Sequence, residues 1–388
     1  MSDQPPDPLQ PQGSGVPGAG DASPEAKKTQ PARRHSRRTV LAVGIPAVAA
    51  TAVVGAGFAP RPTGPARETG DLALAEALRP HLRGHRQVAA AILDGDTRIA
   101  GFGCDQHQEF EIGSVTKTFT GALVMTAIER GELRLDSTVQ EVLGERAAGS
   151  ELAGATVSDL VTHTAGLPTI APNLAFGSVV GSFLRKDLYR GTPDEVVDAA
   201  LAAPLNEPGT HSYSNLSISL AAHLVAHVAG QPWEQLVSAR ITEPLGLGHT
   251  WAPLLQQNLD RSAPRGHDAG GRRAQAWTME GYAPSGGIRS NALEMSTYLA
   301  SMIDGSNPGV GGIEPIAPAG EGQQVGVTWF TTELPGGGTA IWHNGMTGGY
   351  ASFCGWDPDS GRGVLLLTNT ATPVTQLGLD ILDRKVEI

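Results

Sequence analysis

Lysine and cysteine are scarce in this chain, and both shortages restrict what it can be. Its 388 residues include two cysteines, Cys104 and Cys354. Two cysteines do not make a disulfide framework, and these two lack any metal-ligand spacing. We expect both to be unpaired, small, buried side chains, with a bond between them in an oxidising compartment as the alternative. Arginine carries most of the positive charge, because the lysines are only five: Lys27, Lys28, Lys117, Lys186 and Lys385.

Positive charge is also short overall. Lys and Arg together number 28 against 39 Asp and Glu, which gives a formal net charge of −11. Binding of a phosphate backbone needs a basic face, so the composition excludes nucleic acid as a partner. The chain is 40% apolar with a mean hydropathy of −0.13, which indicates a globular core rather than a disordered chain or a polytopic membrane protein.

The N-terminal segment differs in composition from the rest. Residues 1–32 are rich in Pro and Gly and have no periodicity, which predicts disorder. A twin arginine, Arg37-Arg38, then precedes an uncharged stretch that reaches Ala59 and resembles a Tat-type export signal. A membrane anchor over residues 39–59 is the alternative, but Pro46 and the many Gly and Ala residues favour the signal.

These features divide the chain. We expect a disordered tail and signal over residues 1–59, a linker over 60–71 and a folded domain over 72–388. The signal predicts a secreted or cell-envelope protein, with membrane contact only if the signal stays uncleaved.

Strand patterns occur at both ends of the folded domain and helical patterns between them. Residues 88–93 and 97–102 have the pattern of two strands joined by Asp94-Gly95-Asp96, which predicts a hairpin. Three further strands are expected near the C-terminus, over 339–343, 350–356 and 363–368, and helices near 71–80, 114–130, after Thr192, over 217–228, before 302 and over 374–382. We therefore predict an α/β (α+β) fold: an antiparallel sheet built from both chain ends, flanked by helices, with a mainly helical insertion over about 114–285.

One lysine lies inside an apolar helical pattern, in the segment Ser114-Val115-Thr116-Lys117. A serine hydroxyl needs a nearby base to become a nucleophile, and a base three residues on along a helix lies on the same face. Lysine can be that base only if burial or a positive neighbour lowers its pKa. Alone the motif is weak, since a capping serine followed by a solvated lysine has the same spacing.

Two further motifs strengthen this interpretation. Tyr213-Ser214-Asn215 offers a phenol that can move a proton and an amide that can position a lysine. His343-Asn344-Gly345 ends a predicted strand in a small residue, where a substrate backbone can lie alongside and an N–H can face an oxyanion. Taken singly, Tyr213 fits a turn aromatic equally well, and His343 a structural strand histidine.

In this order the three motifs resemble the S-x-x-K, Y-x-N and K/H-x-G motifs of the serine β-lactamase and penicillin-binding protein family. More narrowly, they resemble its branch of class C β-lactamases, D-alanyl-D-alanine carboxypeptidases and esterases. The similarity covers essentially all of residues 72–388, with matching stretches at 110–120, 160–168, 244–247, 286–287 and 342–350.

The resemblance implies a role for each residue of the first two motifs. Ser114 attacks an acyl carbon, Lys117 and Tyr213 move the proton, and Asn215 braces the site. The reaction needs no cofactor and no metal.

The third motif is implied to bind the substrate. The N–H groups of Ser114 and Met346 form the oxyanion hole, Asn344 and Gly345 line the substrate, and His343 faces the leaving group or a substrate carboxylate. β-Lactamases carry Lys where this chain has His343. Histidine weakens recognition of a carboxylate by a fixed charge at neutral pH, and it is familiar from carboxypeptidase and esterase members.

Other catalytic sites are less well supported by the sequence. His223 and His227 are four residues apart on a helix, but Leu224 stands where a zincin has Glu. His163 is expected to order a loop beside the site. No G-x-S-x-G surrounds any serine, and no glycine-rich phosphate loop with its lysine is present.

We expect an exported serine hydrolase that forms an acyl-enzyme on Ser114 with a small-molecule or peptide substrate: a D-amino-acid peptide, an ester or a β-lactam. A D-alanyl-D-alanine carboxypeptidase-like or β-lactamase-related peptidase is favoured. The alternatives are an esterase or amidase of the same family, a peptide-cyclising acyltransferase, and a penicillin-binding sensor that acylates without turnover.

Overall fold

The computed structural model describes residues 67–172, 174, 186–260 and 263–388, all of which lie within one compact unit. The expected tail and signal over 1–59, and the linker as far as residue 66, lie outside these residues and stay predictions. Residues 68–70, expected in the linker, instead form a strand that pairs into the sheet. In the part of the chain that is described, no helix is both long and apolar enough to cross a membrane. Both cysteines are free, as expected.

The described residues form a nine-stranded antiparallel sheet in the order β1-β3-β2-β11-β10-β9-β8-β7-β6, and a two-stranded sheet of β4 and β5. The strands are β1 (Glu68–Gly70), β2 (Val88–Asp94), β3 (Asp96–Phe102), β4 (Phe110–Glu111), β5 (Arg289–Ser290), β6 (Ala317–Gly320), β7 (Gln323–Val325), β8 (Phe330–Glu333), β9 (Thr339–Met346), β10 (Ala351–Trp356) and β11 (Gly363–Thr368).

The sheet joins the two ends of the domain, because β2 pairs with β11 in the centre. The predicted fold class is thus confirmed, and so is the hairpin of β2 and β3, which turns at Asp94↔Asp96. Strands β6 to β8 were not expected. They are short, and β6 contains Pro318 and a register shift, so it lacks the alternation that marks a strand in sequence.

The helices are α1 (Leu72–Leu78), α2 (Thr116–Glu129), α3 (Val139–Leu143), α4 (Val157–Val161), α6 (Pro193–Leu201), α7 (Asn215–Ala229), α8 (Trp233–Val237), α9 (Ala292–Ile303) and α10 (Thr375–Leu382). The 3₁₀ turns η3 (Gly113–Val115) and η7 (Glu280–Ser285) flank the site described below.

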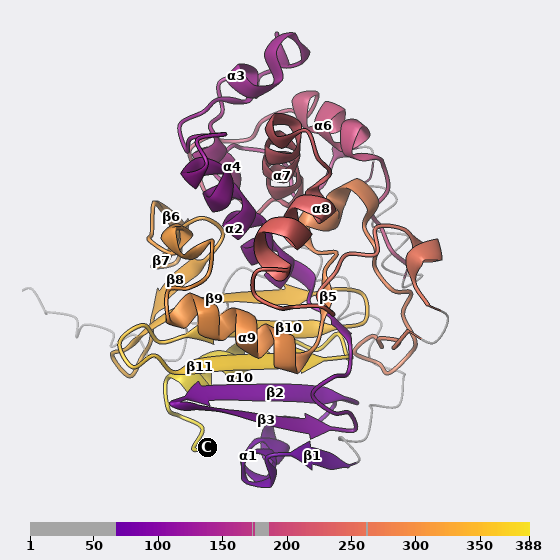
Figure 1. The fold of residues 1–388 in the computed structure, drawn as a ribbon, viewed down its shortest axis with the longest axis vertical. Coiled ribbons are helices and arrows are strands. Elements are labelled where there is room, and N and C mark those ends of the chain that lie inside the picture. The colour runs from indigo at the N-terminus through magenta and orange to yellow at the C-terminus, as the bar shows by residue number, and fades with distance from the viewer. Residues whose placement is uncertain (1–66, 173, 175–185, 261–262) are drawn as a thin grey trace, which may run out of the picture. The chain divides into compact units, whose positions relative to one another are not determined.

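The sheet is buried on both faces, and side chains of β2 alternate between two cores. Ala89, Ala91 and Leu93 belong to the larger core, which contains the apolar residues of α2, α7 and α9. Val88, Ala90 and Ile92 belong to the smaller core with α1 and α10. Helix α9 packs along β2 and β11 on the first face, as Figure 1 shows. The helical region between β4 and β5 therefore meets the sheet on the face that carries the larger core.

Candidate active site

Ser114 and Lys117 lie one turn apart where η3 leads into α2. Gly113 has φ +52°, a left-handed conformation that lets the chain turn sharply out of β4 before the serine. The Ser114 side chain is half-buried, whereas Lys117 is fully buried. The Lys117 Nζ lies 3.0 Å from the Ser114 Oγ. The structure thus brings together the nucleophile and base expected from sequence.

Two other neighbours of Lys117 accept hydrogen bonds from its amine. Its Nζ donates to Asn215 Oδ1 at 2.7 Å and to the Ser285 carbonyl at 2.6 Å. Burial places the pKa of Lys117 well below its ordinary value. A neutral amine has two N–H groups and one lone pair. Because two acceptors take both N–H groups, the lone pair remains for the hydroxyl proton of Ser114.

Tyr213 completes the proton path. Its half-buried ring lies 4.8 Å from Lys117 Nζ, and its hydroxyl interacts with the Ser114 side chain. Burial raises the pKa of the phenol, so it stays protonated. Tyr213 is therefore suited to pass a proton onward, and Lys117 to accept the first one.

Asn215 is held by a residue that sequence analysis missed. It begins α7, and its Nδ2 donates to the Tyr189 hydroxyl at 2.7 Å, which fixes Oδ1 toward Lys117. Tyr189 is buried and packs edge-on against Trp277. It lies in a connection without periodicity, so no sequence pattern marks it.

Tyr189→Phe is expected to lower kcat by about tenfold, because Asn215 Nδ2 loses its acceptor. A buried donor without a partner costs about 1–3 kcal/mol. The apolar packing of the ring is retained, so the melting temperature should change little. Steady-state kinetics and thermal unfolding of the variant test this. An unchanged kcat would show that Lys117 does not depend on this contact.

The backbone N–H groups of Ser114 and Met346 lie close together. A Cβ added to Gly345 would stand 2.9 Å from Ser114 N, and one added to Gly113 would stand 2.7 Å from Met346 N. The Thr347 N–H donates to the Tyr350 carbonyl, which immediately precedes β10. Amide directions alternate along a strand, so the Met346 N–H points to the other edge of β9, where β8 pairs no further than Trp342. Two N–H groups beside the nucleophile are the geometry of an oxyanion hole.

Gly345→Ala is expected to reduce kcat/KM by about 10²-fold or more, since displacement of one oxyanion donor has an effect of that size. The added Cβ would lie 2.0 Å from the Ile112 carbonyl oxygen, so the strand must shift away from Ser114. Gly248→Ala is the matched control, because a Cβ there meets nothing within 4 Å. Equal activity of the two variants would contradict the close approach of β9 to Ser114.

His343 is buried on the face of β9 that lies toward Ser114. Its Nδ1 lies 2.6 Å from the Asn344 carbonyl, to which it donates, and its Nε2 has no partner among the described groups. Burial is the main cause that lowers the pKa of His343 to about 3, and the nearby Lys117 lowers it further. The ring is therefore neutral at pH 7 and presents a lone pair rather than a positive charge.

Asn344 corrects one expectation. Its Nδ2 donates to Thr375 Oγ1 beside α10, on the opposite face of the sheet from Ser114. Side chains alternate along β9, so His343 and Asn344 cannot both face the substrate. The Asn344 side chain does not line the site. His163 has the structural role expected of it: its Nδ1 accepts from the Ser214 N–H and its ring packs on Tyr213.

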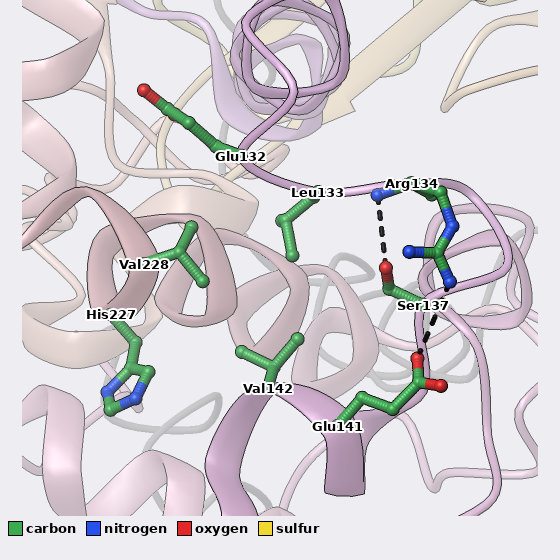
Figure 2. Close-up of a pocket in the computed structure, with 8 residues that line it drawn as sticks. All are labelled: Glu132, Leu133, Arg134, Ser137, Glu141, Val142, His227 and Val228. Atoms are coloured by element: carbon green, nitrogen blue, oxygen red, sulfur yellow. Dashed lines mark hydrogen bonds and ion pairs between the residues drawn. The ribbon is translucent and has the colours of Figure 1, made fainter.

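A cleft of about 410 Å³ lies beyond the C-terminal end of α2, away from Ser114 (Figure 2). Charged side chains line it, including Glu132, Arg134 and Glu141, and Arg134 bonds to Ser137 through its N–H. Its surface is open, and none of the three motifs contributes to it.

The fold and the site are those of a serine hydrolase, in which a serine lies beside a buried lysine on an antiparallel sheet with a helical insertion. Residues 74–386 match the beta-lactamase family, and the chain belongs to that family.

Relatives of this chain have several activities. The chain is 25% identical to a beta-lactamase of Pseudomonas fluorescens over 304 residues, which cover 68% of this chain and 80% of the relative. It is 29% identical to esterase EstB of Burkholderia gladioli over 318 residues, 71% of this chain and 80% of the relative. The crystal structure of a D-stereospecific amidohydrolase from Streptomyces sp. superposes with a TM-score of 0.68 at 22% identity, covering 80% of this chain and 98% of that one, which shows a shared fold.

Proposed function

We propose that this chain is an exported serine hydrolase that forms an acyl-enzyme on Ser114. The observation that carries the proposal is the buried Lys117 Nζ, 3.0 Å from Ser114 Oγ, with two other acceptors within hydrogen-bond distance. In the neutral amine these two acceptors take both N–H groups, which leaves the lone pair to activate the serine. The export part of the proposal depends on the twin-arginine segment alone.

Acylation follows from the positions of the groups. Lys117 takes the hydroxyl proton as Ser114 Oγ bonds to the acyl carbon, and the N–H groups of Ser114 and Met346 stabilise the oxyanion. When the bond to the leaving group breaks, that group receives the proton through Tyr213. Water then attacks the acyl carbon and gives its proton to Lys117. The bond between the acyl carbon and Ser114 Oγ breaks, Oγ takes that proton back, and the acid leaves.

Two classes of substrate are candidates. The first is a peptide ending in D-alanyl-D-alanine, for which an exported enzyme has access to the cell wall. The second is an uncharged ester or amide, which the neutral His343 favours because it offers no fixed charge to a substrate carboxylate.

Intact-protein mass spectrometry over time, with a penicillin, a p-nitrophenyl ester and a D-alanyl-D-alanine peptide, tests the proposal. We expect an adduct on Ser114 that forms and decays with at least one substrate. Peptide turnover supports the first candidate, and ester turnover without peptide cleavage supports the second. A penicillin adduct that never decays, together with no turnover of the ester or the peptide, would contradict hydrolysis. No adduct with any of the three would contradict the mechanism.

A further inference from the structure

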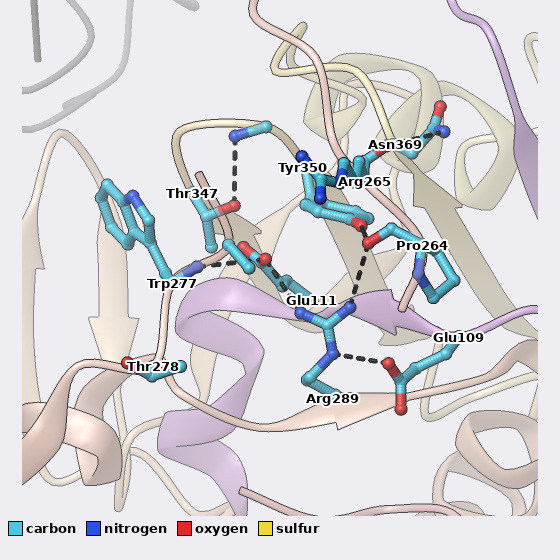
Figure 3. Close-up of polar contacts among 12 residues, drawn as sticks. Glu109, Glu111, Pro264, Arg265, Trp277, Thr278, Arg289, Thr347, Tyr350 and Asn369 are labelled. Carbon is cyan, nitrogen blue, oxygen red and sulfur yellow. Dashed lines mark hydrogen bonds and ion pairs between the residues drawn. The ribbon is translucent and has the colours of Figure 1, made fainter. Parts of the chain in front are cut away.

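A buried group of charges lies directly behind the oxyanion hole, and none of the three motifs includes it. Arg289 on β5 is fully buried, and it donates to Glu109 Oε1 at 2.6 Å and to Glu111 Oε1 at 3.0 Å (Figure 3). Glu111 is 2% exposed and lies three residues before Ser114. Its Oε1 also accepts from the Trp277 N–H at 3.1 Å. One buried guanidinium thus pairs with two carboxyl groups, of which Glu111 is buried and Glu109 is partly exposed.

This group contacts the turn that follows Met346. The Thr347 side chain interacts with the Glu111 carboxyl. The Oε2 of that carboxyl accepts no well-formed hydrogen bond within the described part of the chain. Thr347 Oγ1 also accepts from the Gly349 N–H at 3.4 Å. The Arg289 guanidinium lies 5.8 Å from the centre of the Tyr350 ring, and both side chains donate to the Pro264 carbonyl. Figure 3 shows these side chains gathered between β5 and the turn over residues 347–350.

The segments that carry the two oxyanion donors both contact the Glu111–Arg289 pair. The Ser114 N–H follows β4, which contains Glu111 and pairs with Arg289 on β5. The Met346 N–H precedes Thr347, which faces the same carboxyl. We therefore expect a change in the Glu111–Arg289 pair to move one donor relative to the other. Misplacement by about 1 Å can cost about 10²-fold in rate.

We propose that Glu111 is a positioning residue, an inference that rests on the proposed function. Through Arg289 and Thr347 it sets the distance between the Ser114 and Met346 N–H groups. It does not touch the reacting atoms. Acylation and deacylation both pass through an oxyanion, so a displaced donor slows both steps while substrate affinity is retained.

The protonation of Glu111 provides a second measurable effect. Burial is the main cause that raises the pKa of Glu111 to about 7, Asp187 adds to the rise, and Arg289 opposes it. The other charged or titratable groups around the cluster are Glu109 and Tyr350, which face Arg289. Glu111 is ionised above this pKa and protonated below it, so Gln reproduces the acid form in shape and charge.

Glu111→Gln is expected to lower kcat for a p-nitrophenyl ester by at least about tenfold at about pH 9, with KM within about twofold. The deficit should shrink toward about pH 6, where wild-type Glu111 is itself protonated. The ratio of the two enzymes at each pH removes the titration of Lys117, which they share. Glu132→Gln is the matched control, because Glu132 forms a two-bond pair with Arg240 at the far end of α2.

The outcomes separate the two proposals. A normal kcat in Glu111→Gln, or a loss of kcat that is equal at every pH, would contradict only the positioning role and not the proposed function. Absence of any Ser114 adduct in the wild-type protein would contradict the proposed function and the positioning role with it. If Glu111→Gln does not fold, Arg289→Lys keeps the charge but loses the two-pronged contact, and the same loss of kcat with retained KM is expected.

Discussion

Ser114→Ala is expected to reduce kcat/KM by about 10⁴- to 10⁶-fold and to abolish the covalent adduct with every substrate, because removal of a nucleophile leaves only binding and the oxyanion hole. The fold should be retained. The side chain is half-buried and forms its contacts with Lys117 and Tyr213, so the free energy of unfolding should fall by about 1 kcal/mol or less. Steady-state kinetics, intact mass and thermal unfolding measure these three effects.

Ser296→Ala provides the control for this variant. Ser296 is buried on α9, and its hydroxyl donates to the Ala292 carbonyl of its own helix. Full activity is expected for it. An adduct that persists in Ser114→Ala would assign the nucleophile to another residue.

Lys117→Arg is expected to be as inactive as Lys117→Met, with kcat reduced by about 10³-fold or more in both. The reason is protonation. Arginine keeps the positive charge but cannot lose its proton in a protein, so it cannot accept one from Ser114. If Lys117 served only as a cation, Arg would retain much of the activity and Met would not.

The surroundings of Lys117 make this comparison informative. Met leaves Asn215 Oδ1 and the Ser285 carbonyl without their donor, and Arg must fit a larger group into a fully buried space. Both variants therefore need a thermal unfolding measurement beside the kinetics. Lys385→Arg is the control, since Lys385 is half-exposed and pairs with Asp383 near the C-terminus.

The sequence predicted the sheet where alternation is regular and missed it where the strands are short. The strands β2, β3, β9, β10 and β11 all contain long alternating or apolar runs, whereas β1 and β6 to β8 have three or four residues each. A short edge strand gains its structure from the neighbour with which it pairs, and that pairing leaves little trace in local sequence.

The same distinction applies to the site. Ser114, Lys117, Tyr213 and Asn215 were predicted because each motif has a fixed spacing, and the structure places them in contact. Asn344 was assigned wrongly because the motif spans three consecutive strand residues, of which neighbours face opposite sides.

The residues that sequence analysis missed support the site across long sequence separations. Tyr189 holds Asn215, the Ser285 carbonyl accepts from Lys117, and Arg289 pairs with Glu111 from β5. Each contact joins segments between 26 and 178 residues apart. Only the fold brings such segments together, so spacing along the chain could not reveal them.

The protonation state of Lys117 is the central claim, and the scarcity of lysine makes it directly measurable. In a protein labelled at lysine Cε, at most five signals are expected in the NMR spectrum, and the Lys117 signal is identified by its absence in Lys117→Met. We expect that signal to titrate well below the pKa of about 10.4 of an ordinary lysine, so that the amine is neutral at the pH where the enzyme works. A Lys117 signal that titrates near 10.4 with the others would contradict the account.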